Sequence, residues 1–421
     1  MFNKLNIFIK KNAKFIEILR IFIYITNMIF RKVYKKLKRR VLEPRAFLQV
    51  ILGPRQVGKT TAIKQVLAEV DLPNLMVSAD GIPSANSSWI SEQWETARTR
   101  VALSGSREFL LVLDEIQKIN NWSEIVKKEW DSDTANGINI KVVLLGSSRL
   151  LLMNGLTESL AGRFELIRMG HWNLDEMQSA FDFTLNDYIY FGGYPGAARL
   201  KNQESRWRRY ILDSIVEPAI SKDVLQTSNI YKPALLKQVF ELGSYYSGKL
   251  LSLTKMLGQL QDAGNVTTIA NYMQILSECN LLCGLQKFAR DASRKYNSIP
   301  KYQVYNSALH TAYTEGTFKR TLEDPKKWGT FVESAVGANL VSNADQFRYK
   351  VYYWREHDME VDFILVRGES VVAIEVKSGA RATNSGLSRF ATDFTPRRSF
   401  IVGSGGIPLE EFFKADLSQL F

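Results

Sequence analysis

The chain has 421 residues, of which 45% are apolar and 23% charged, so it can form several domains and is neither wholly disordered nor collagen-like. Its 55 Lys and Arg residues outnumber 43 Asp and Glu, and the formal net charge of +12 makes nucleic acid and anionic membrane candidate partners. Cys279 and Cys283 are too few for a disulfide framework, so we expect a cytoplasmic protein.

The excess positive charge lies almost entirely in residues 1–40. This segment holds twelve basic residues and one acidic residue, so it carries +11 and the remaining chain carries +1. The segment is also apolar, but only Ile21–Phe30 runs without a charge, whereas a membrane-spanning helix needs about 20 residues. Three interpretations stay open: a basic anchor on anionic lipid, which makes the protein peripheral to a membrane; a helix packed on the first domain; or residues absent from a mature protein that starts at Met28.

Residues 47–145 alternate short apolar runs with helical patterns. The runs of strand length are Phe47–Leu52, Leu75–Ser78, Phe109–Leu113 and Lys141–Leu145, and helical stretches between them are Thr60–Val70 and Trp89–Leu103. Continuous apolar runs separated by helices are typical of a parallel sheet that is buried on both faces. The sequence therefore predicts an α/β fold for this region.

A glycine-rich turn follows the first predicted strand. Its residues are Gly53, Pro54, Arg55, Gln56, Val57, Gly58, Lys59 and Thr60, followed by Thr61, and they fit the phosphate-loop pattern GxxxxGK[ST]. The glycines let successive backbone N–H groups point at phosphate oxygens, and the following helix adds its positive N-terminal end. Lys59 would reach the β- and γ-phosphates, and the Thr60 hydroxyl would bind Mg²⁺. We expect ATP as the nucleotide, because no guanine-specific NKxD signature is present.

A pair of acids supports this interpretation. Asp114 and Glu115 come directly after the apolar run Phe109–Leu113, and the carboxyl ends of parallel strands are where ligands bind in open α/β folds. Asp114 would hold Mg²⁺ through water, and Glu115 would orient or deprotonate the attacking water.

Two further residues are candidates for parts of an ATPase site. Ser147 follows the run Lys141–Leu145, where a polar side chain could sense the γ-phosphate; an ordinary strand-end turn explains the sequence equally well. Arg163 could act as an arginine finger on the nucleotide of a neighbouring subunit, and the alternative is a surface salt bridge.

Several segments resemble one known family. They are GPRQVGKTT (53–61), LVLDEIQKI (111–119), GSSRLLL (146–152), ESLAGRFE (158–165), FGGYP (191–195), TTIANYMQIL (267–276), WGTFVESAV (328–336) and AIEVKSG (373–379). The chain is similar to bacterial and archaeal AAA-type ATPases that carry a C-terminal domain of unknown function, over about nine-tenths of its length. The resemblance implies an ATPase followed by a winged-helix-like piece and a nuclease-like piece, and it favours the arginine-finger role of Arg163.

The middle region has the pattern of a helix-turn-helix with a wing. Two helical runs, Leu251–Leu257 and Val266–Leu276, surround a break, and the apolar Leu281–Leu285 follows them. Four residues near the start of the second run could contact DNA: Thr267, Thr268, Asn271 and Tyr272. The alternative is a winged helix used for packing, since the second run carries no Lys or Arg.

The C-terminal region contains a hairpin with acidic residues on one face. Its strands are Glu360–Val366 and Val371–Lys377, and a two-residue turn between them pairs Asp362 with Glu375. Lys377 lies two positions beyond Glu375 and therefore on the same face. The hairpin thus gathers two carboxylates and a lysine on one surface.

This arrangement is that of the D…ExK (PD-(D/E)XK) nucleases. In them two carboxylates hold Mg²⁺ against the scissile phosphate, and the lysine acts on the attacking water. Glu333, in the helical run Phe331–Leu340, would supply a further acid to the set of Asp362, Glu375 and Lys377. The alternative is a scaffold without activity, in which the lysine only compensates two like charges that face each other in a sheet.

Together these interpretations predict an α/β protein that has five parts, one of which is a P-loop NTPase core. They are a basic apolar extension (1–40), the ATPase core (41–170), a helical lid (171–230), a winged-helix-like domain (231–315) and a small α/β nuclease-like domain (316–421). We expect a Mg²⁺-dependent ATPase coupled to a nucleic-acid-binding module, with nuclease activity left open. The alternatives are an ATP-dependent switch that binds DNA or protein without cutting, and a membrane-associated ATPase; an Arg163 finger would also require a homo-oligomer.

Overall fold

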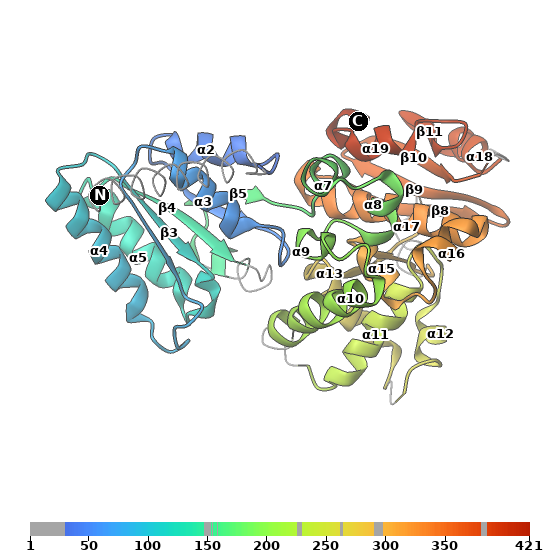
Figure 1. Ribbon diagram of the computed structural model, residues 1–421, viewed down its shortest axis with the longest axis horizontal. Helices are drawn as coiled ribbons and strands as arrows, with labels where there is room; N and C mark the ends of the chain where they lie inside the picture. The colour runs from blue at the N-terminus through green and yellow to red at the C-terminus, as the bar shows by residue number, and fades with distance from the viewer. Residues whose placement is uncertain are drawn as a thin grey trace, which may run out of the picture.

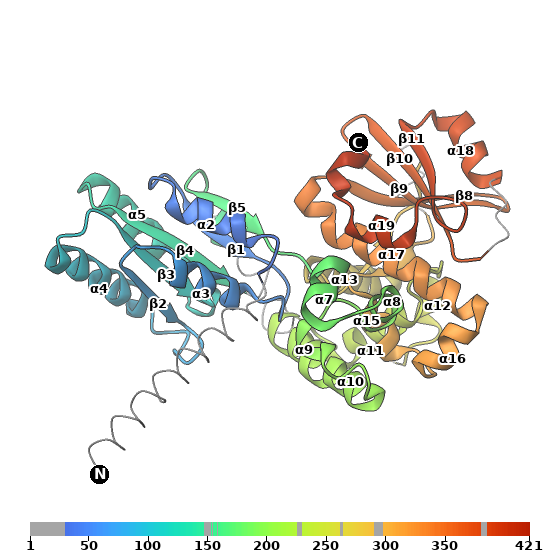
Figure 2. The same cartoon turned by 45° about the horizontal axis from the view of Figure 1, so that its top comes forward.

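The computed structural model describes residues 30–146, 153, 155–157, 159–224, 230–261, 264–289, 298–379 and 385–421. They form two lobes that lie side by side (Figure 1). The first lobe holds a five-stranded sheet and its helices, and the chain passes from its last strand directly into the second lobe (Figure 2).

The first lobe is a parallel sheet between two layers of helices. Its elements are α2 (Tyr34–Leu42), β1 (Leu48–Leu52), α3 (Lys59–Glu69), β2 (Asn74–Ser78), α4 (Ser88–Ser104), β3 (Phe109–Asp114), the short 3₁₀ helix η1 (Ile116–Lys118), α5 (Trp122–Ala135), β4 (Ile140–Gly146) and β5 (Phe164–Arg168). The strand order is β2-β3-β4-β1-β5, with all neighbours parallel. Successive residues of β3 alternate between faces: Leu111 packs with α4 and α5, and Val112 packs with α2 and α3. The predicted α/β sheet is confirmed.

Helix α2 belongs to this lobe. Its buried residues Tyr34, Leu37 and Val41 recur at helical spacing and pack on α3, so the predicted boundary at residue 40 falls inside a helix. The part of the basic segment that the structure describes is thus a helix packed on the first domain. Residues 1–29 lie outside the described residues, and their membrane-anchor role stays a prediction. None of the helices in the described ranges combines the length and apolar content that crossing a bilayer requires.

The second lobe begins with helices and a small sheet. Its first elements are α7 (Leu174–Phe181), α8 (Leu185–Phe191), α9 (Pro195–Ala198), α10 (Glu204–Tyr210), the π-helical η2 (Ile211–Val216) and η3 (Ala219–Val224), α11 (Pro233–Tyr245), α12 (Leu253–Leu257), α13 (Val266–Glu278), β6 (Leu282–Leu285), β7 (Lys301–Val304) and α15 (Ser307–Tyr313). Strands β6 and β7 pair antiparallel. Helix α12 begins two residues later than predicted, because the Ser252 side chain accepts a hydrogen bond from the Lys255 N–H and caps it.

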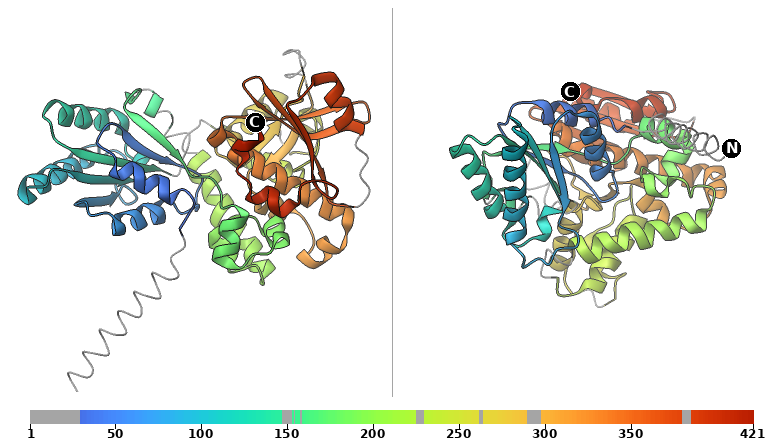
Figure 3. Two further views of the ribbon diagram at one scale, coloured as in Figure 1. Left: turned by 90° about the horizontal axis from the view of Figure 1, so that it is seen from above. Right: turned by 60° about the vertical axis from the view of Figure 1, so that its left-hand side comes forward.

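The chain ends in a mixed sheet that packs on a long helix. The elements are α16 (Phe318–Glu323), α17 (Pro325–Phe347), β8 (Lys350–Glu356), β9 (Met359–Arg367), β10 (Ser370–Lys377), α18 (Ser385–Phe394), β11 (Arg398–Gly403), α19 (Leu409–Lys414) and the 3₁₀ turn η4 (Leu417–Leu420). The strand order is β11-β10-β9-β8, and α17 packs against this sheet (Figure 3). The pairing of Arg367 with Ser370 sets the β9–β10 register, as the two-residue turn predicted.

The buried residue His310 makes the stability of the second lobe depend on pH. His310 of α15 is 3% exposed, and its Nδ1 lies 2.8 Å from the Ser244 carbonyl oxygen, so the neutral ring donates its Nδ1 proton there. Burial lowers the pKa of His310 to about 4. Since the unfolded chain takes up this proton near pH 6.5, His310 removes up to about 3 kcal/mol of stability as the pH falls from about 6.5 to 4.

We predict that His310→Gln flattens the loss of unfolding free energy between about pH 7 and pH 5. The measurement is urea unfolding followed by tryptophan fluorescence at each pH. His357→Gln, on the exposed turn between β8 and β9, is the matched control and should keep the wild-type slope. Equal slopes for wild type and His310→Gln would contradict the prediction.

Candidate functional site

The glycine-rich turn joins β1 to α3 in a form that brings it close to β5. A Cβ atom on Gly53 would lie 2.1 Å from the Met169 carbonyl oxygen, so only glycine fits this approach. Gly58, with φ of +89°, and Gln56, with φ of +58°, are in the left-handed region, and Gly58 begins α3. The backbone thus curls at the N-terminus of α3, where N–H groups have no helical partner.

Three predicted residues meet at the carboxyl edge of the sheet. The Lys59 ammonium is buried and donates to the carbonyl oxygens of Gly53 and Pro54, both at 2.8 Å. The Thr60 hydroxyl donates to Asp114 Oδ2 at 2.9 Å. Burial raises the pKa of the Asp114 carboxyl. A buried carboxylate that has lost its water binds cations and hydroxyl donors strongly. A hydroxyl beside a buried carboxylate is the donor set that Mg²⁺ prefers next to phosphate, so these residues fit that ion.

Glu115 lies directly beyond this pair. Its backbone has φ of +54°, its N–H donates to Asp114 Oδ1 at 3.0 Å, and Gln117 Nε2 donates to its Oε2 at 2.6 Å. The strained backbone turns the chain out of β3 and fixes the carboxylate at the sheet edge. Strand β4 separates β3 from β1 and ends at Gly146. Ser147 follows Gly146 but lies outside the described residues.

Arg163 lies at the opposite edge of the sheet. Its carbonyl oxygen accepts from the N–H of Leu48, which is the first residue of β1. The P-loop follows Leu52, the last residue of the same strand. The guanidinium forms two hydrogen bonds with Asp131, at 2.8 Å and 3.0 Å. The salt bridge considered as the alternative is therefore present. A five-residue strand of about 16 Å separates Arg163 from the P-loop of its own chain. Arg163 would therefore have to act on the nucleotide of a neighbouring copy, and this arginine-finger role stays a prediction.

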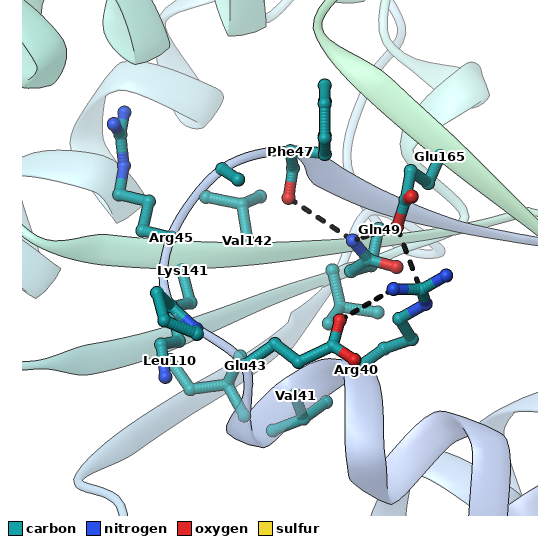
Figure 4. Close-up of a pocket in the computed structure, with 13 residues that line it drawn as sticks. Arg40, Val41, Glu43, Arg45, Phe47, Gln49, Leu110, Lys141, Val142 and Glu165 are labelled. Atoms are coloured by element: carbon teal, nitrogen blue, oxygen red, sulfur yellow. Dashed lines mark hydrogen bonds and ion pairs between the residues drawn. The ribbon is translucent and has the colours of Figure 1, made fainter.

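A cavity of about 310 Å³ lies at the same edge as Arg163, and four of its polar side chains, Arg40, Glu43, Gln49 and Glu165, are joined to one another (Figure 4). Arg40 Nη1 lies 2.6 Å from Glu43 Oε2, and Arg40 Nε lies 3.5 Å from Glu165. Gln49 Nε2 also donates to Glu165, at 3.2 Å. These contacts connect α2 to β1 and β5. We therefore assign a structural role to the side chains around the cavity, and no ligand.

The second lobe contacts the P-loop directly. The Val57 carbonyl oxygen accepts from Trp172 Nε1 at 3.0 Å, and also from Nη1 of Arg31, which lies just before α2, at 2.6 Å. The Gln56 side chain accepts from the Tyr210 hydroxyl at 2.7 Å and donates to the Ser214 carbonyl oxygen at 3.0 Å. These partners come from distant parts of the sequence, and no local pattern predicted them.

The predicted hairpin acids lie side by side in the last sheet. Asp362 is 9% and Glu375 8% exposed, and Asp362 Oδ2 accepts from the Val376 N–H at 2.8 Å. Lys377 pairs with Glu375 Oε1, as expected for residues on one face. Burial, and after it the Asp362 carboxylate, raises the pKa of Glu375 to about 7.

A lysine that the sequence analysis missed lies within this cluster. Lys301, the first residue of β7, has no exposed surface, and its ammonium lies 2.6 Å from Glu333 Oε1. It is also 3.4 Å from Glu360 Oε1 and from Asp362 Oδ1. Burial alone would lower the pKa of Lys301, but these three carboxylates outweigh it and raise the pKa above its ordinary value.

The predicted nuclease ligands therefore do not fit a Mg²⁺ ion. Glu333 and Asp362 lie around the Lys301 ammonium, and Glu375 Oε1 pairs with Lys377. Among the described residues, no three His, Cys, Asp or Glu side chains are arranged to hold a metal ion. Lys301 could have been noticed only as one charge at the start of the run Lys301–Val304, a weak signal.

The helix-turn-helix candidates divide into two groups. Thr267 and Asn271 are exposed on α13, where a ligand can reach them. Tyr272 is buried, and its hydroxyl accepts from the Lys232 N–H at 3.3 Å, so it packs the helix. Contact between this helix and DNA stays a prediction.

Family models match most of the described chain. Residues 46–178 match a model described as an AAA domain. This segment is an AAA domain. Residues 182–319 and 328–411 match two models described as domains of unknown function, DUF8612 and DUF4143. The resemblance drawn from the sequence motifs is confirmed, and the P-loop, Thr60 and Asp114 all lie within the AAA domain.

Two relatives that match large parts of the chain are uncharacterized proteins. Rv2008c of Mycobacterium tuberculosis is 25% identical over 359 residues, which are 83% of this chain and 74% of that protein. MJ1544 of Methanocaldococcus jannaschii is 24% identical over 304 residues, and the match covers 68% of this chain and 64% of that protein, just under two thirds of its length.

Solved structures align with parts of both lobes. The Thermotoga maritima RuvB Holliday junction branch migration motor aligns with a TM-score of 0.33 and 17% identity, over 61% of this chain and 90% of that chain. The Aeropyrum pernix ORC1 protein in complex with DNA aligns with a TM-score of 0.32 and 14% identity, over 70% and 96%.

We predict that Gly53→Ala weakens nucleotide binding to the AAA domain by about tenfold or more, because the new Cβ collides with the backbone of Met169 and displaces the P-loop. Titration with a fluorescent ATP analogue measures the effect. Gly81→Ala is the matched control, since nothing lies within 4 Å of its Cβ. Wild-type affinity in Gly53→Ala would show that the approach to β5 does not position the loop.

Proposed function

We propose that the protein binds ATP and hydrolyses it with Mg²⁺ in the AAA domain. The observation that carries the proposal is the hydrogen bond between Thr60 and the buried Asp114, at the mouth of the P-loop that holds Lys59. Thr60 and Asp114 would hold Mg²⁺, which would neutralise charge that develops on the phosphate oxygens.

The chain's own groups have distinct parts in this reaction. Lys59 and the backbone N–H groups at the start of α3 bind the phosphates. Glu115, held by Gln117, accepts a proton from the attacking water and orients it. Glu115 comes directly after Asp114, and the Asp114 side chain accepts from both the Glu115 N–H and the Thr60 hydroxyl.

We predict that Lys59→Ala abolishes ATP turnover and weakens ATP binding, because the phosphates lose their ammonium partner. Glu115→Gln should retain ATP and lower the turnover rate by about 100-fold or more, since an amide cannot accept the proton. Phosphate release and filter binding of labelled ATP separate the two effects. Lys64→Ala, exposed on the same helix, is the control. Turnover at the wild-type rate in both site variants would refute the proposed site.

A second candidate function is a nucleotide-controlled binding switch that does not cut nucleic acid. Two observations favour it over cleavage. Gln56 and Val57 of the P-loop contact Tyr210 and Trp172, so a change at the phosphates reaches the second lobe. Lys301 pairs with two of the predicted metal ligands, Glu333 and Asp362.

The surface between the lobes supports nucleic acid as the partner. A cavity of about 820 Å³ there is lined by α2, β5, the end of α17 and the region of α19. Seven basic and four acidic side chains line it; the basic ones are Arg31, Lys32, Lys36, Arg40, Arg168, Arg348 and Lys414. Arg31, Lys32, Arg40, Arg168 and Lys414 form salt bridges with acidic side chains. Lys36 and Arg348 would therefore be the main attraction for the phosphate backbone of DNA, which they would contact without reading its sequence.

We predict that Lys36→Glu together with Arg348→Glu weakens DNA binding by about tenfold and lowers the salt dependence of log K by about two, because two phosphate contacts are lost. Both side chains are exposed in the cleft. Fluorescence anisotropy of labelled duplex, with and without a non-hydrolysable ATP analogue, measures this. Lys128→Glu, exposed on α5 away from the cleft, should bind as wild type. If the double variant binds as tightly as the control, the cleft is not the DNA surface.

A further inference from the structure

Lys301 is held in place by the backbone on both sides of it. It pairs with Leu285 in the β6–β7 sheet, and the next residue, Tyr302, donates to the Lys249 carbonyl oxygen at 3.0 Å and accepts from the Gly248 N–H at 2.8 Å. The side chain therefore starts from a fixed point in the segment before α15 and reaches into the sheet of β9 and β10.

The Lys301 ammonium is surrounded by oxygen atoms. Besides Glu333, Glu360 and the Asp362 carboxylate, it lies 3.3 Å from the Asp362 carbonyl oxygen. Several oxygen atoms around one buried cation are also the environment of a divalent metal ion. Burying a single unpaired charge costs several kcal/mol, so this ammonium and these carboxylates stabilise the fold only together.

Glu375 provides a second and independent observation. The residue is 92% buried, and its Oε1 pairs with Lys377, but its Oε2 makes no hydrogen bond within the described part of the structure. A buried carboxylate oxygen without a partner is rare in folded proteins. This oxygen lies next to Asp362 and accepts no hydrogen bond within the described residues, so it is available as a ligand for a cation.

We propose that Lys301 is the built-in cation of the carboxylate cluster, in the place that a divalent metal ion takes in D…ExK nucleases, so that the lysine and a metal ion exclude each other. The C-terminal domain then keeps the nuclease-like hairpin without its metal. Lys301 belongs to β7, so the segment before α15 controls whether the cluster can take a metal ion.

Removal of the lysine tests the proposal. In Lys301→Met the cluster should lose its counter-charge, so the Tm in EDTA should fall below that of wild type. Mn²⁺ should restore part of this loss and bind about tenfold or more tightly than to wild type, as measured by calorimetry without nucleotide. Adding Glu375→Gln to the Lys301→Met protein should remove both the recovery of Tm with Mn²⁺ and the tighter Mn²⁺ binding. Lys249→Met, which removes an exposed lysine nearby, should behave as wild type.

Two results would overturn the proposal. One is a folded Lys301→Met protein that shows no Mn²⁺ binding dependent on Glu375. The other needs no lysine variant: wild-type protein that binds Mn²⁺, and loses that binding in Glu375→Gln, would show that lysine and metal ion coexist. The absence of such binding in wild type is the expected result. Because nucleotide is left out, neither outcome depends on ATP hydrolysis.

Discussion

The buried Arg31 guanidinium joins the two lobes at the P-loop. It donates to the Val57 carbonyl oxygen, pairs with Glu176 of α7 at 2.8 Å, and donates to the carbonyl oxygens of Gly170 and His171. Arginine stays charged at any ordinary pH, and a buried charge is stable only when its donors are matched by acceptors. These contacts therefore form together, and the shape of the P-loop depends on the position of the second lobe.

Much of the first lobe could be predicted because its signals are local. The apolar runs that become β1, β3 and β4 are each long enough for one strand, and the glycines of the P-loop have conformations that few other residues adopt. The hairpin register followed from the same kind of argument, since a two-residue turn leaves one way to pair Arg367 with Ser370. In these cases neighbours in sequence decide the structure.

Contacts between distant segments could not be predicted. Lys301 reaches Glu333 and Asp362, and a single charge at the start of a strand gives no sign of the side chain's direction. Arg31 looked like one of many charges in a basic segment, but its partner Glu176 lies 145 residues away. In both cases a buried charge finds its partners through the tertiary fold, and sequence spacing carries no record of that pairing.

The place of Arg31 also bears on how the chain can be divided. A shortened chain beginning at Ala46, where the AAA family match starts, would keep each strand of the sheet. It would leave Glu176 buried without its counter-charge and would uncover the side of α3 that packs on Leu37 and Val41. Arg31 and α2 accordingly belong to the functional unit of the AAA domain, although they precede the residues that match the family model.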